Sequence, residues 1–171
     1  NQRLTQVTYG DGTTERYTYD AVGNRLTATT PEGTTRYSYD AQNRLVEEIQ
    51  PDGSVLSYGY DAAGNRTQLD VSAGGSTTST SYSFDALNRL EVVADSQGQK
   101  TLYTYDAVGN RESVSYPGGN VTLYDYDALN RLTRLTTTDA ADQIVADYAY
   151  TLDATGRRTQ VQEAHSGRTT S

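Results

Sequence analysis

The side chains of this chain that could do acid–base, metal or nucleophilic chemistry are mostly carboxylates. Its 171 residues include 15 aspartates and 7 glutamates, one histidine, His165, and no cysteine. The carboxylates could bind calcium, but the sequence has neither the Asp-x-Asp-x-Asp-Gly loop nor the Gly-Gly-x-Gly-x-Asp repeat of calcium sites. A lone histidine gives little support to a Ser/His/Asp triad or a histidine metal cluster. We therefore expect no catalytic residue, no metal and no cofactor, and we do not interpret the chain as an enzyme.

Composition excludes further classes of function. Without cysteine there is no disulfide framework, thiol chemistry or zinc ribbon. The glycine pairs at Gly74 and Gly118 lack the Lys-Ser/Thr and helix context of a phosphate loop, so we interpret them as turns. A net charge of -8 and a pI near 4.5 argue against nucleic acid or anionic lipid as the main partner. No stretch approaches the roughly 20 apolar residues of a membrane-spanning helix, so we expect no transmembrane segment.

What recurs is a tyrosine-aspartate signature, Tyr-x-Tyr-Asp, which is followed by a Gly or Asn and then an arginine. A long form, such as Asp20 to Arg25, alternates with a short form, such as Asp40 to Arg44. A weaker seventh copy around Asp153 keeps the long spacing. A fixed period of about 21 residues marks a repeat architecture. The signature residues of the six complete copies are Tyr17, Tyr19, Asp20, Gly23, Arg25, Tyr37, Tyr39, Asp40, Asn43, Arg44, Tyr58, Tyr60, Asp61, Gly64, Arg66, Tyr82, Phe84, Asp85, Asn88, Arg89, Tyr103, Tyr105, Asp106, Gly109, Arg111, Tyr124, Tyr126, Asp127, Asn130 and Arg131.

We interpret these residues first as a structural repeat motif. The tyrosines of a pair stand at i and i+2, which places both rings on one face of a strand, where they can pack across strands. The aspartate and arginine would cap the turn and form an ion pair across it or between repeats. A second interpretation is an exposed tyrosine face that binds glycans or an enclosed, partly unfolded cargo, because tyrosine is apolar in body and polar at its tip.

The elements that must position these residues are strands and turns. Segments such as residues 15–20 and 102–105 have strand spacing, and the runs after each arginine are short and rich in Leu, Val and Thr. The signature turn places Asp first and Gly or Asn fourth, which matches a type I turn that ends in a left-handed residue. Variable turns, such as residues 51–53, alternate with the signature turns. We therefore predict an all-β chain of tandem antiparallel β-hairpins, with all signature turns along one edge of the sheet.

The number of strands and the composition of the chain constrain the shape of the sheet and the size of its core. About 15 strands exceed the roughly ten that an open twisted sheet usually holds, so we predict one long, coiling sheet. Leu, Ile, Val and Phe make up only 28 of the 171 residues, so the 15 tyrosines must supply much of a thin core. We take residues 1–171 as a single array of about seven to eight repeats. Because residues 1–4 look like the tail of a short copy, we expect the chain to be a segment of a longer protein.

The Tyr-x-Tyr-Asp-x-x-Gly-Asn-Arg pattern, repeated at about 21 residues, resembles the YD repeats of bacterial Rhs proteins, of shell subunits of insecticidal toxin complexes, and of teneurins. The resemblance covers nearly the whole chain. It implies a β-sheet strip that spirals into a hollow shell around a C-terminal toxin, in a protein that is secreted or lies at the bacterial cell surface. The Asp-Pro dipeptide of the family's self-cleaving module does not occur here. The autoproteolytic role is therefore assigned to no residue.

Three hypotheses about function follow, each with its own partners. The first is a shell segment that encapsulates and delivers a toxin, with the enclosed polypeptide and neighbouring repeats as partners. The second is an extracellular adhesion module that binds glycans. The third is a fibre or tube in which successive chains associate end to end.

Overall fold

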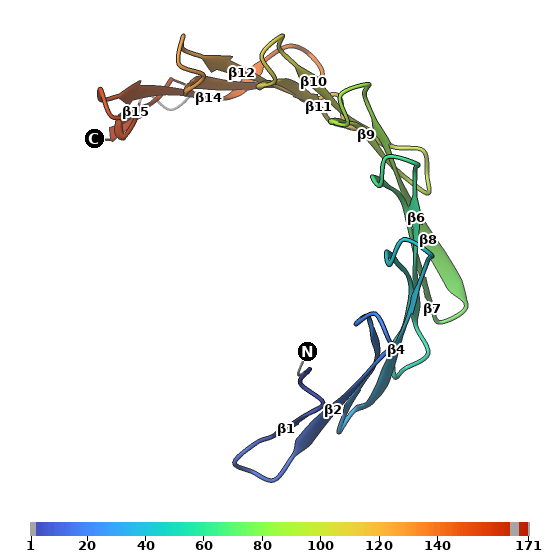
Figure 1. Cartoon of the computed structure of the whole chain (residues 1–171). Coiled ribbons are helices and arrows are strands. Elements are labelled where there is room, and N and C mark those ends of the chain that lie inside the picture. The colour runs from blue at the N-terminus through green and yellow to red at the C-terminus, as the bar shows by residue number, and fades with distance from the viewer. Residues whose placement is uncertain (1–2, 165–167, 171) are drawn as a thin grey trace. The chain divides into compact units, whose positions relative to one another are not determined.

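The structure is a computed structural model that describes residues 3–164 and the backbone of residues 168–170. His165 and residues 1–2 lie outside the described residues, so the hypotheses that concern them stay untested. The chain divides into two compact units, residues 1–82 and 83–171, which are described separately (Figure 1). The search for a helix long and apolar enough to cross a membrane found none among the described residues.

The first unit consists of antiparallel strands that follow one another in space in their chain order. Each strand pairs with the next through a short turn, as at Tyr17↔Ala28 between the second and third strands. Strand β8 contains the boundary between the two units. The strands are β1 (Gln6–Thr8), β2 (Thr14–Tyr19), β3 (Arg25–Thr30), β4 (Gly33–Tyr39), β5 (Leu45–Ile49), β6 (Val55–Tyr60), β7 (Arg66–Ala73) and β8 (Ser76–Phe84).

The second unit repeats this arrangement. Its strands are also antiparallel and in chain order, with Tyr103↔Val114 and Tyr124↔Leu135 as examples of the register. The strands are β9 (Leu90–Asp95), β10 (Lys100–Tyr105), β11 (Arg111–Ser115), β12 (Val121–Tyr126), β13 (Leu132–Thr138), β14 (Ile144–Leu152), β15 (Arg158–Glu163) and β16 (Arg168–Thr170).

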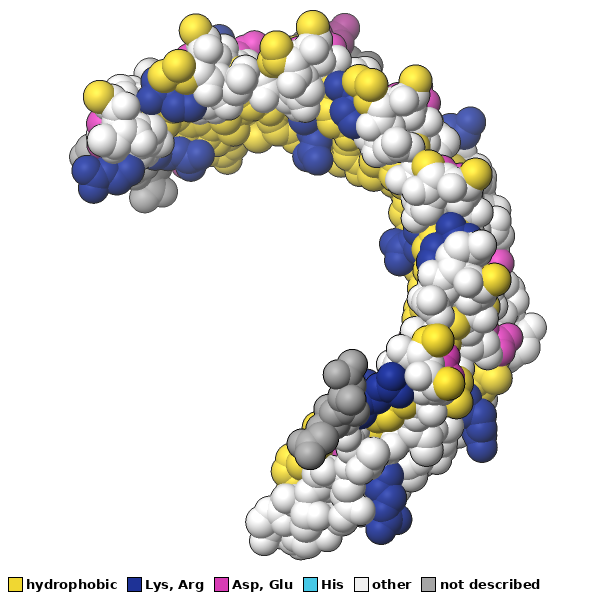
Figure 2. Space-filling view, in the orientation of Figure 1, with side chains coloured by type: hydrophobic (Ala, Val, Ile, Leu, Met, Phe, Trp, Pro, Cys, Tyr) yellow, Lys and Arg dark blue, Asp and Glu magenta, His cyan; other side chains and the backbone are white. Residues whose placement is uncertain are grey.

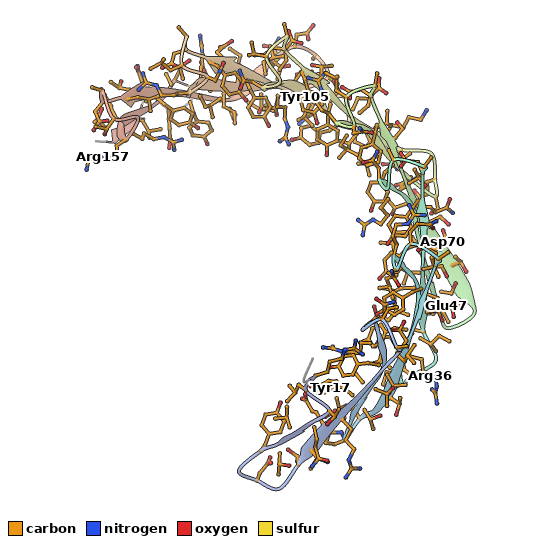
Figure 3. The ribbon with its side chains drawn as sticks, in the orientation of Figure 1. Tyr17, Arg36, Glu47, Asp70, Tyr105 and Arg157 are labelled. Carbon is orange, nitrogen blue, oxygen red and sulfur yellow. The ribbon has the colours of Figure 1, made fainter. Side chains whose placement is uncertain are left out.

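The two faces of each unit differ, because side chains alternate along a strand. In the first unit Tyr17 points to one side of the sheet, whereas Arg36, Glu47 and Asp70 point to the other (Figure 3). We call these sides the tyrosine face and the polar face. In the second unit, hydrophobic side chains gather on one face, with cationic side chains beside them (Figure 2).

The core is thin. Val114 is the one hydrophobic side chain that is buried in the described part of the chain, at 2% exposure. Most tyrosines are half-buried, and burial raises the pKa of the hydroxyls of Tyr39, Tyr58 and Tyr126. The stability of each unit therefore depends on hydrogen bonds and ring packing within a single layer.

The predicted all-β fold with tandem antiparallel hairpins is confirmed. Coiling into a shell or tube stays a prediction, as does the treatment of residues 1–171 as a single array.

Candidate functional site

All seven signature turns have the same backbone geometry. The N–H of the aspartate donates to the carbonyl four residues later, as from Asp20 to Asn24 at 2.9 Å and from Asp40 to Arg44 at 2.9 Å. The fourth residue of the turn has positive φ in every copy, from 58° at Asn130 to 116° at Gly23. Gly adopts this conformation without a Cβ clash and Asn tolerates it better than most residues, which explains their place in the repeat. The predicted turn geometry is therefore present.

The long and short forms are not turns of different length. In both, the residue before the aspartate pairs with the fifth residue after it, as in Tyr19↔Arg25 and Tyr39↔Leu45. Each of these hairpins has a register irregularity just before that pair, which fits the bulge expected at such a loop. The number of residues from the aspartate to the arginine therefore suggested two turn lengths, but the backbone has only one. What changes is the residue at three positions: the fourth turn residue is Gly or Asn, the fifth is Asn or Arg, and the first strand residue is Arg or Leu.

In the short copies the fifth residue is an arginine that pairs with the aspartate of its own turn. The distance from Nε to Oδ2 is 2.7 Å in each of the pairs Arg44–Asp40, Arg89–Asp85 and Arg131–Asp127. Both partners are partly shielded, with side-chain exposures of 20–30%. The last copy holds a longer pair, Arg157–Asp153, at 3.3 Å.

The aspartate also caps the turn backbone. Asp40 Oδ1 accepts hydrogen bonds from the N–H groups of Gln42 and Arg44, both at 2.9 Å. The N–H of Arg44 is the main cause that lowers the pKa of Asp40, and the guanidinium of Arg44 adds to this effect. The pKa values of Asp85 and Asp127 are lowered for the same reasons.

In the long copies an asparagine amide takes the place of the guanidinium. The Nδ2 atom donates to the aspartate Oδ2 from Asn24 at 2.9 Å, from Asn65 at 3.0 Å and from Asn110 at 2.9 Å. This role of the asparagines was not predicted from the sequence. Their signal was their distance of four residues from the aspartate, which equals that of the short-copy arginine.

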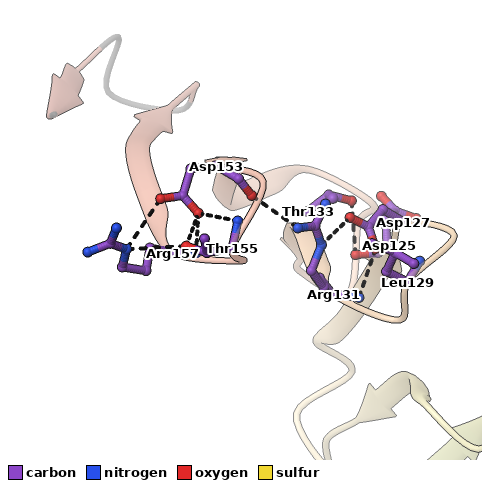
Figure 4. Close-up of polar contacts among 8 residues, drawn as sticks. All are labelled: Asp125, Asp127, Leu129, Arg131, Thr133, Asp153, Thr155 and Arg157. Carbon is purple, nitrogen blue, oxygen red and sulfur yellow. Dashed lines mark hydrogen bonds and ion pairs between the residues drawn. The ribbon is translucent and has the colours of Figure 1, made fainter.

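Polar side chains also link several signature turns to the next one along the chain. A short-copy arginine donates through NH1 to the carbonyl of the following signature aspartate, as from Arg44 to Asp61 at 3.0 Å and from Arg131 to Asp153 at 3.1 Å (Figure 4). Arg3 donates to Asp20 in the same way at 2.7 Å. Within each unit these contacts join adjacent repeats along the edge of the signature turns.

In the long copies an asparagine side chain forms the hydrogen bond to the following signature turn. Asn24 Nδ2 donates to Asn43 Oδ1 at 2.8 Å, and Asn110 Nδ2 donates to Asn130 Oδ1 at 3.0 Å. The asparagine of a short copy therefore has two functions: it adopts positive φ and it accepts a bond from the preceding repeat. In these two links the long copy supplies the amide donor and the short copy supplies the acceptor.

The second tyrosine of a signature reaches back to the preceding repeat. Its hydroxyl donates to the carbonyl of the first residue after the preceding signature turn. The four bonds are Tyr19 to Leu4 at 2.8 Å, Tyr39 to Arg25 at 3.0 Å, Tyr60 to Leu45 at 2.8 Å and Tyr105 to Leu90 at 2.9 Å. The fourth copy carries Phe84, which has no hydroxyl to donate.

Arginines lie over tyrosine rings throughout both units. In short copies the ring is the second tyrosine of the next repeat, as for Arg44 over Tyr60 at 4.7 Å. In long copies the arginine is the first residue of a strand and lies over a first tyrosine, as for Arg25 over Tyr17 at 4.8 Å. Two further long-copy stacks are Arg66 over Tyr82 at 4.9 Å and Arg111 near Tyr103 and Tyr124 at 5.4 and 5.9 Å. In the last copy Arg158 lies over Tyr150, the second tyrosine, at 3.8 Å.

The polar face has its own contacts, which the sequence analysis did not anticipate. Hydroxyls pair across strands in Thr18–Thr27, Thr29–Thr34, Ser72–Thr77 and Thr104–Ser113, at 2.7–2.9 Å. In the second unit Arg134 binds Asp147, which is 3% exposed, through two bonds of 2.8 and 2.6 Å. These contacts hold strands together without an apolar layer on this side.

One hollow of about 290 Å³ lies in the second unit, beside the third long and third short signature turns. Its polar lining includes Asp106, Glu112, Asp125 and Asp127. Asp106 and Asp127 already bind Asn110 and Arg131. Among the described residues, the search for three or more His, Cys, Asp or Glu side chains placed to hold a metal ion found no group.

The structure therefore places the predicted motif residues in two sets. The aspartates, the Gly or Asn of each turn and the short-copy arginines gather along the signature-turn edge of each unit. The tyrosines and the long-copy arginines lie on the tyrosine face. The scaffold function of these residues stays a proposal.

Comparison with known proteins gives one family and several partial similarities. The model of the RHS Repeat family matches residues 1–35, 25–55, 39–77, 84–121 and 105–142. The tRNA3(Ser)-specific nuclease WapA of Bacillus spizizenii is 36% identical over 149 residues, which are 86% of this chain and 6% of that protein. The chain therefore spans a small part of this relative.

Solved structures are similar only in fold. The Tc holotoxin pore of Photorhabdus luminescens is 12% identical with a TM-score of 0.36, over 88% of this chain and 12% of that one. A porin-like protein from Bacteroides uniformis is 14% identical with a TM-score of 0.40, over 92% and 85% of the two chains. Scores this low carry no argument about function.

Proposed function

The chain belongs to the RHS repeat family, and from this membership we propose that it is a wall segment of a protein that encloses and delivers a toxin. The protein is secreted or lies at the bacterial cell surface. Its repeats form the barrier, and the toxic activity belongs to sequence outside this chain. The relative of Bacillus spizizenii, a nuclease of which the chain spans 6%, supports this division of roles.

The observation that carries the proposal is the linkage between repeats. Within each unit the signature turns are joined along one edge, by Arg44 to Asp61 and Asn24 to Asn43 in the first and by Asn110 to Asn130 and Arg131 to Asp153 in the second. The carboxylates, amides and guanidiniums of these turns are already engaged in hydrogen bonds within the structure. A wall needs such lateral continuity, whereas a catalytic site needs groups left for a substrate.

Protease protection tests the proposal. The protein that contains this chain and its neighbouring sequence is treated with a nonspecific protease, and the fragments are identified by mass spectrometry. We expect the toxin domain to survive as long as the repeat region is intact, and to be digested when expressed alone. Equal digestion of the toxin domain with and without the repeats would contradict enclosure.

The two alternative functions, an adhesion module and a fibre or tube, predict different results with the same protein. An adhesion module leaves the flanking domain accessible to protease and binds glycans. A fibre or tube gives particles whose length grows with protein concentration.

A further inference from the structure

Across the residues that the structure describes, the long-copy arginines are among the cations that form no ion pair with the chain's carboxylates. In the described part of the chain, the ion pairs formed by signature arginines involve Arg44, Arg89, Arg131 and Arg157. Arg25, Arg66 and Arg111 are exposed and lie over tyrosine rings instead. We call these three the stacked arginines. The stacked arginines form no such ion pair because each is the first residue of a strand, whereas the paired arginines are the fifth residue of a turn.

From this arrangement we propose that the tyrosine face of each unit binds an acidic, extended polypeptide at its stacked arginines, Arg25 and Arg66 in the first unit and Arg111 in the second. The inference rests on the proposed function and names the chemistry of the enclosed partner. Arg66 donates one N–H to the hydroxyl of Tyr82 at 3.5 Å. A guanidinium has five N–H groups, so a stacked arginine still has donors that can bind a carboxylate through two parallel hydrogen bonds.

On the tyrosine face of the first unit, the stacked arginines and the glutamates lie at opposite ends of the strands. The stacked arginines begin their strands, so they lie in the half next to the signature turns. On the strands of this face in the first unit, Glu48 and Glu15 lie toward the variable turns and have partners: Glu48 accepts a bond from Gln50, and Glu15 accepts one from the hydroxyl of Tyr17. The signature aspartates at the other edge are bound within their own turns, as Asp20 is by Asn24 and Asp61 is by Asn65. A chain with net charge -8 therefore still offers a positive stripe to an acidic partner.

The covered rings favour a polypeptide over a sugar. Glycans bind tyrosine by stacking on an open ring face, but the ring faces of Tyr17 and Tyr82 are occupied by arginines at 4.8 and 4.9 Å. Second tyrosines such as Tyr60 use their hydroxyls on backbone carbonyls. The remaining contacts are guanidinium edges and half-buried aliphatic surface such as Leu56 and Leu69, which suit a peptide of mixed acidic and aliphatic residues.

Strand spacing sets the spacing of the partner's carboxylates. Arg25 and Arg66 begin β3 and β7, which are four strands apart, or about 19 Å at ~4.8 Å per strand. An extended chain spans this distance in about six residues at ~3.3 Å each. The preferred partner therefore carries an acidic residue about every sixth position.

The test measures fluorescence anisotropy of a labelled peptide of Ser, Thr and Val with glutamates six residues apart, against the 171-residue chain at low ionic strength. A second peptide has glutamine at the same positions. We expect the glutamate peptide to bind more tightly, and the triple variant R25Q/R66Q/R111Q to bind it at least about threefold more weakly, in keeping with exposed ion pairs. Added salt should weaken binding by the unmodified chain.

The matched control is R16Q/R36Q/K100Q, which removes the same charge from exposed positions on the polar face. It should bind the glutamate peptide as the unmodified chain does. Equal losses in both triple variants, or equal binding of the two peptides, would overturn the inference. So would stronger binding of an oligogalacturonate, because that result assigns the surface to acidic glycans. If the first triple variant does not fold, the single variants R25Q and R111Q carry the same test.

The peptides are free in solution, so the result does not depend on whether a shell forms. Peptide binding together with a failed protease-protection experiment would overturn the enclosure proposal and leave this surface assignment standing.

Discussion

At the scale of single residues, the signature turn depends on one left-handed position and one carboxylate. Asn43 has a φ of 61° and also accepts a bond from Asn24. Its backbone conformation costs other residues free energy because Cβ crowds the following carbonyl oxygen. The repeat therefore alternates between Gly, which has no Cβ, and Asn, which tolerates the conformation and adds a link.

Substitution of Asn43 separates these two contributions. Asn43→Ala and Asn43→Gly both remove the bond from Asn24, but only alanine introduces the left-handed strain. We expect Asn43→Ala to be less stable than Asn43→Gly by about 1 kcal/mol in urea denaturation. Equal stability of the two variants would show that the positive φ contributes nothing at this turn.

Acid should weaken the signature edge. The pKa values of Asp40, Asp85 and Asp127 are lowered in the folded chain by turn N–H groups and the paired guanidiniums. A lowered pKa contributes stability that is full above the unfolded value of ~3.9 and is lost as pH falls through the folded value. We therefore expect thermal stability to decline below about pH 4.

The control variant is D40N/D85N/D127N, in which asparagine can still accept the turn N–H bonds but cannot titrate. Its melting temperature should be lower than that of the unmodified chain at pH 7, and should change less between pH 5 and pH 2. Circular dichroism follows both. A variant that matches the unmodified chain at every pH would rule out the carboxylates as the source of the acid response.

At the scale of elements, the hairpins are joined by tyrosine hydroxyls that cross from one repeat to the preceding one. The hydroxyl of Tyr60 donates to the carbonyl of Leu45 at 2.8 Å. On the same strand, burial is the main cause that raises the pKa of the Tyr58 hydroxyl. We expect Tyr60→Phe to lower the free energy of unfolding by about 1 kcal/mol, since it leaves a carbonyl without its donor.

Tyr58→Phe is the matched control, because it removes a hydroxyl from the same strand and face. It should change stability less than Tyr60→Phe does. Urea denaturation of both variants gives the comparison. A larger loss in Tyr58→Phe would contradict the assignment of the inter-repeat bond to the second tyrosine.

The strands and turns could be predicted from the sequence because their determinants are local. Alternation of Tyr17 and Tyr19 marks a strand, and Gly or Asn after Asp marks a left-handed turn. The hydrogen bonds between repeats could not, because they join residues 14 to 22 positions apart, such as Arg25 with Tyr39 and Arg131 with Asp153. Spacing to the arginine was misleading, since Asn24 and Arg44 occupy the same turn position while Arg25 lies on a strand.

At the scale of the molecule, the account depends on repeats that act together and not on a single site. Each unit has a thin core and a row of linked turns along one edge, so lateral continuity supplies much of what a buried layer supplies in other folds. A wall that encloses a toxin requires this continuity to extend through the neighbouring repeats of the longer protein. The tyrosine face would then be the side that an acidic partner contacts.

Electron microscopy of the whole protein that contains this chain tests the central claim most directly. The account predicts closed, hollow particles of uniform size, with density inside that disappears when the toxin domain is deleted. Open filaments, or closed particles that look the same with and without that domain, would contradict it.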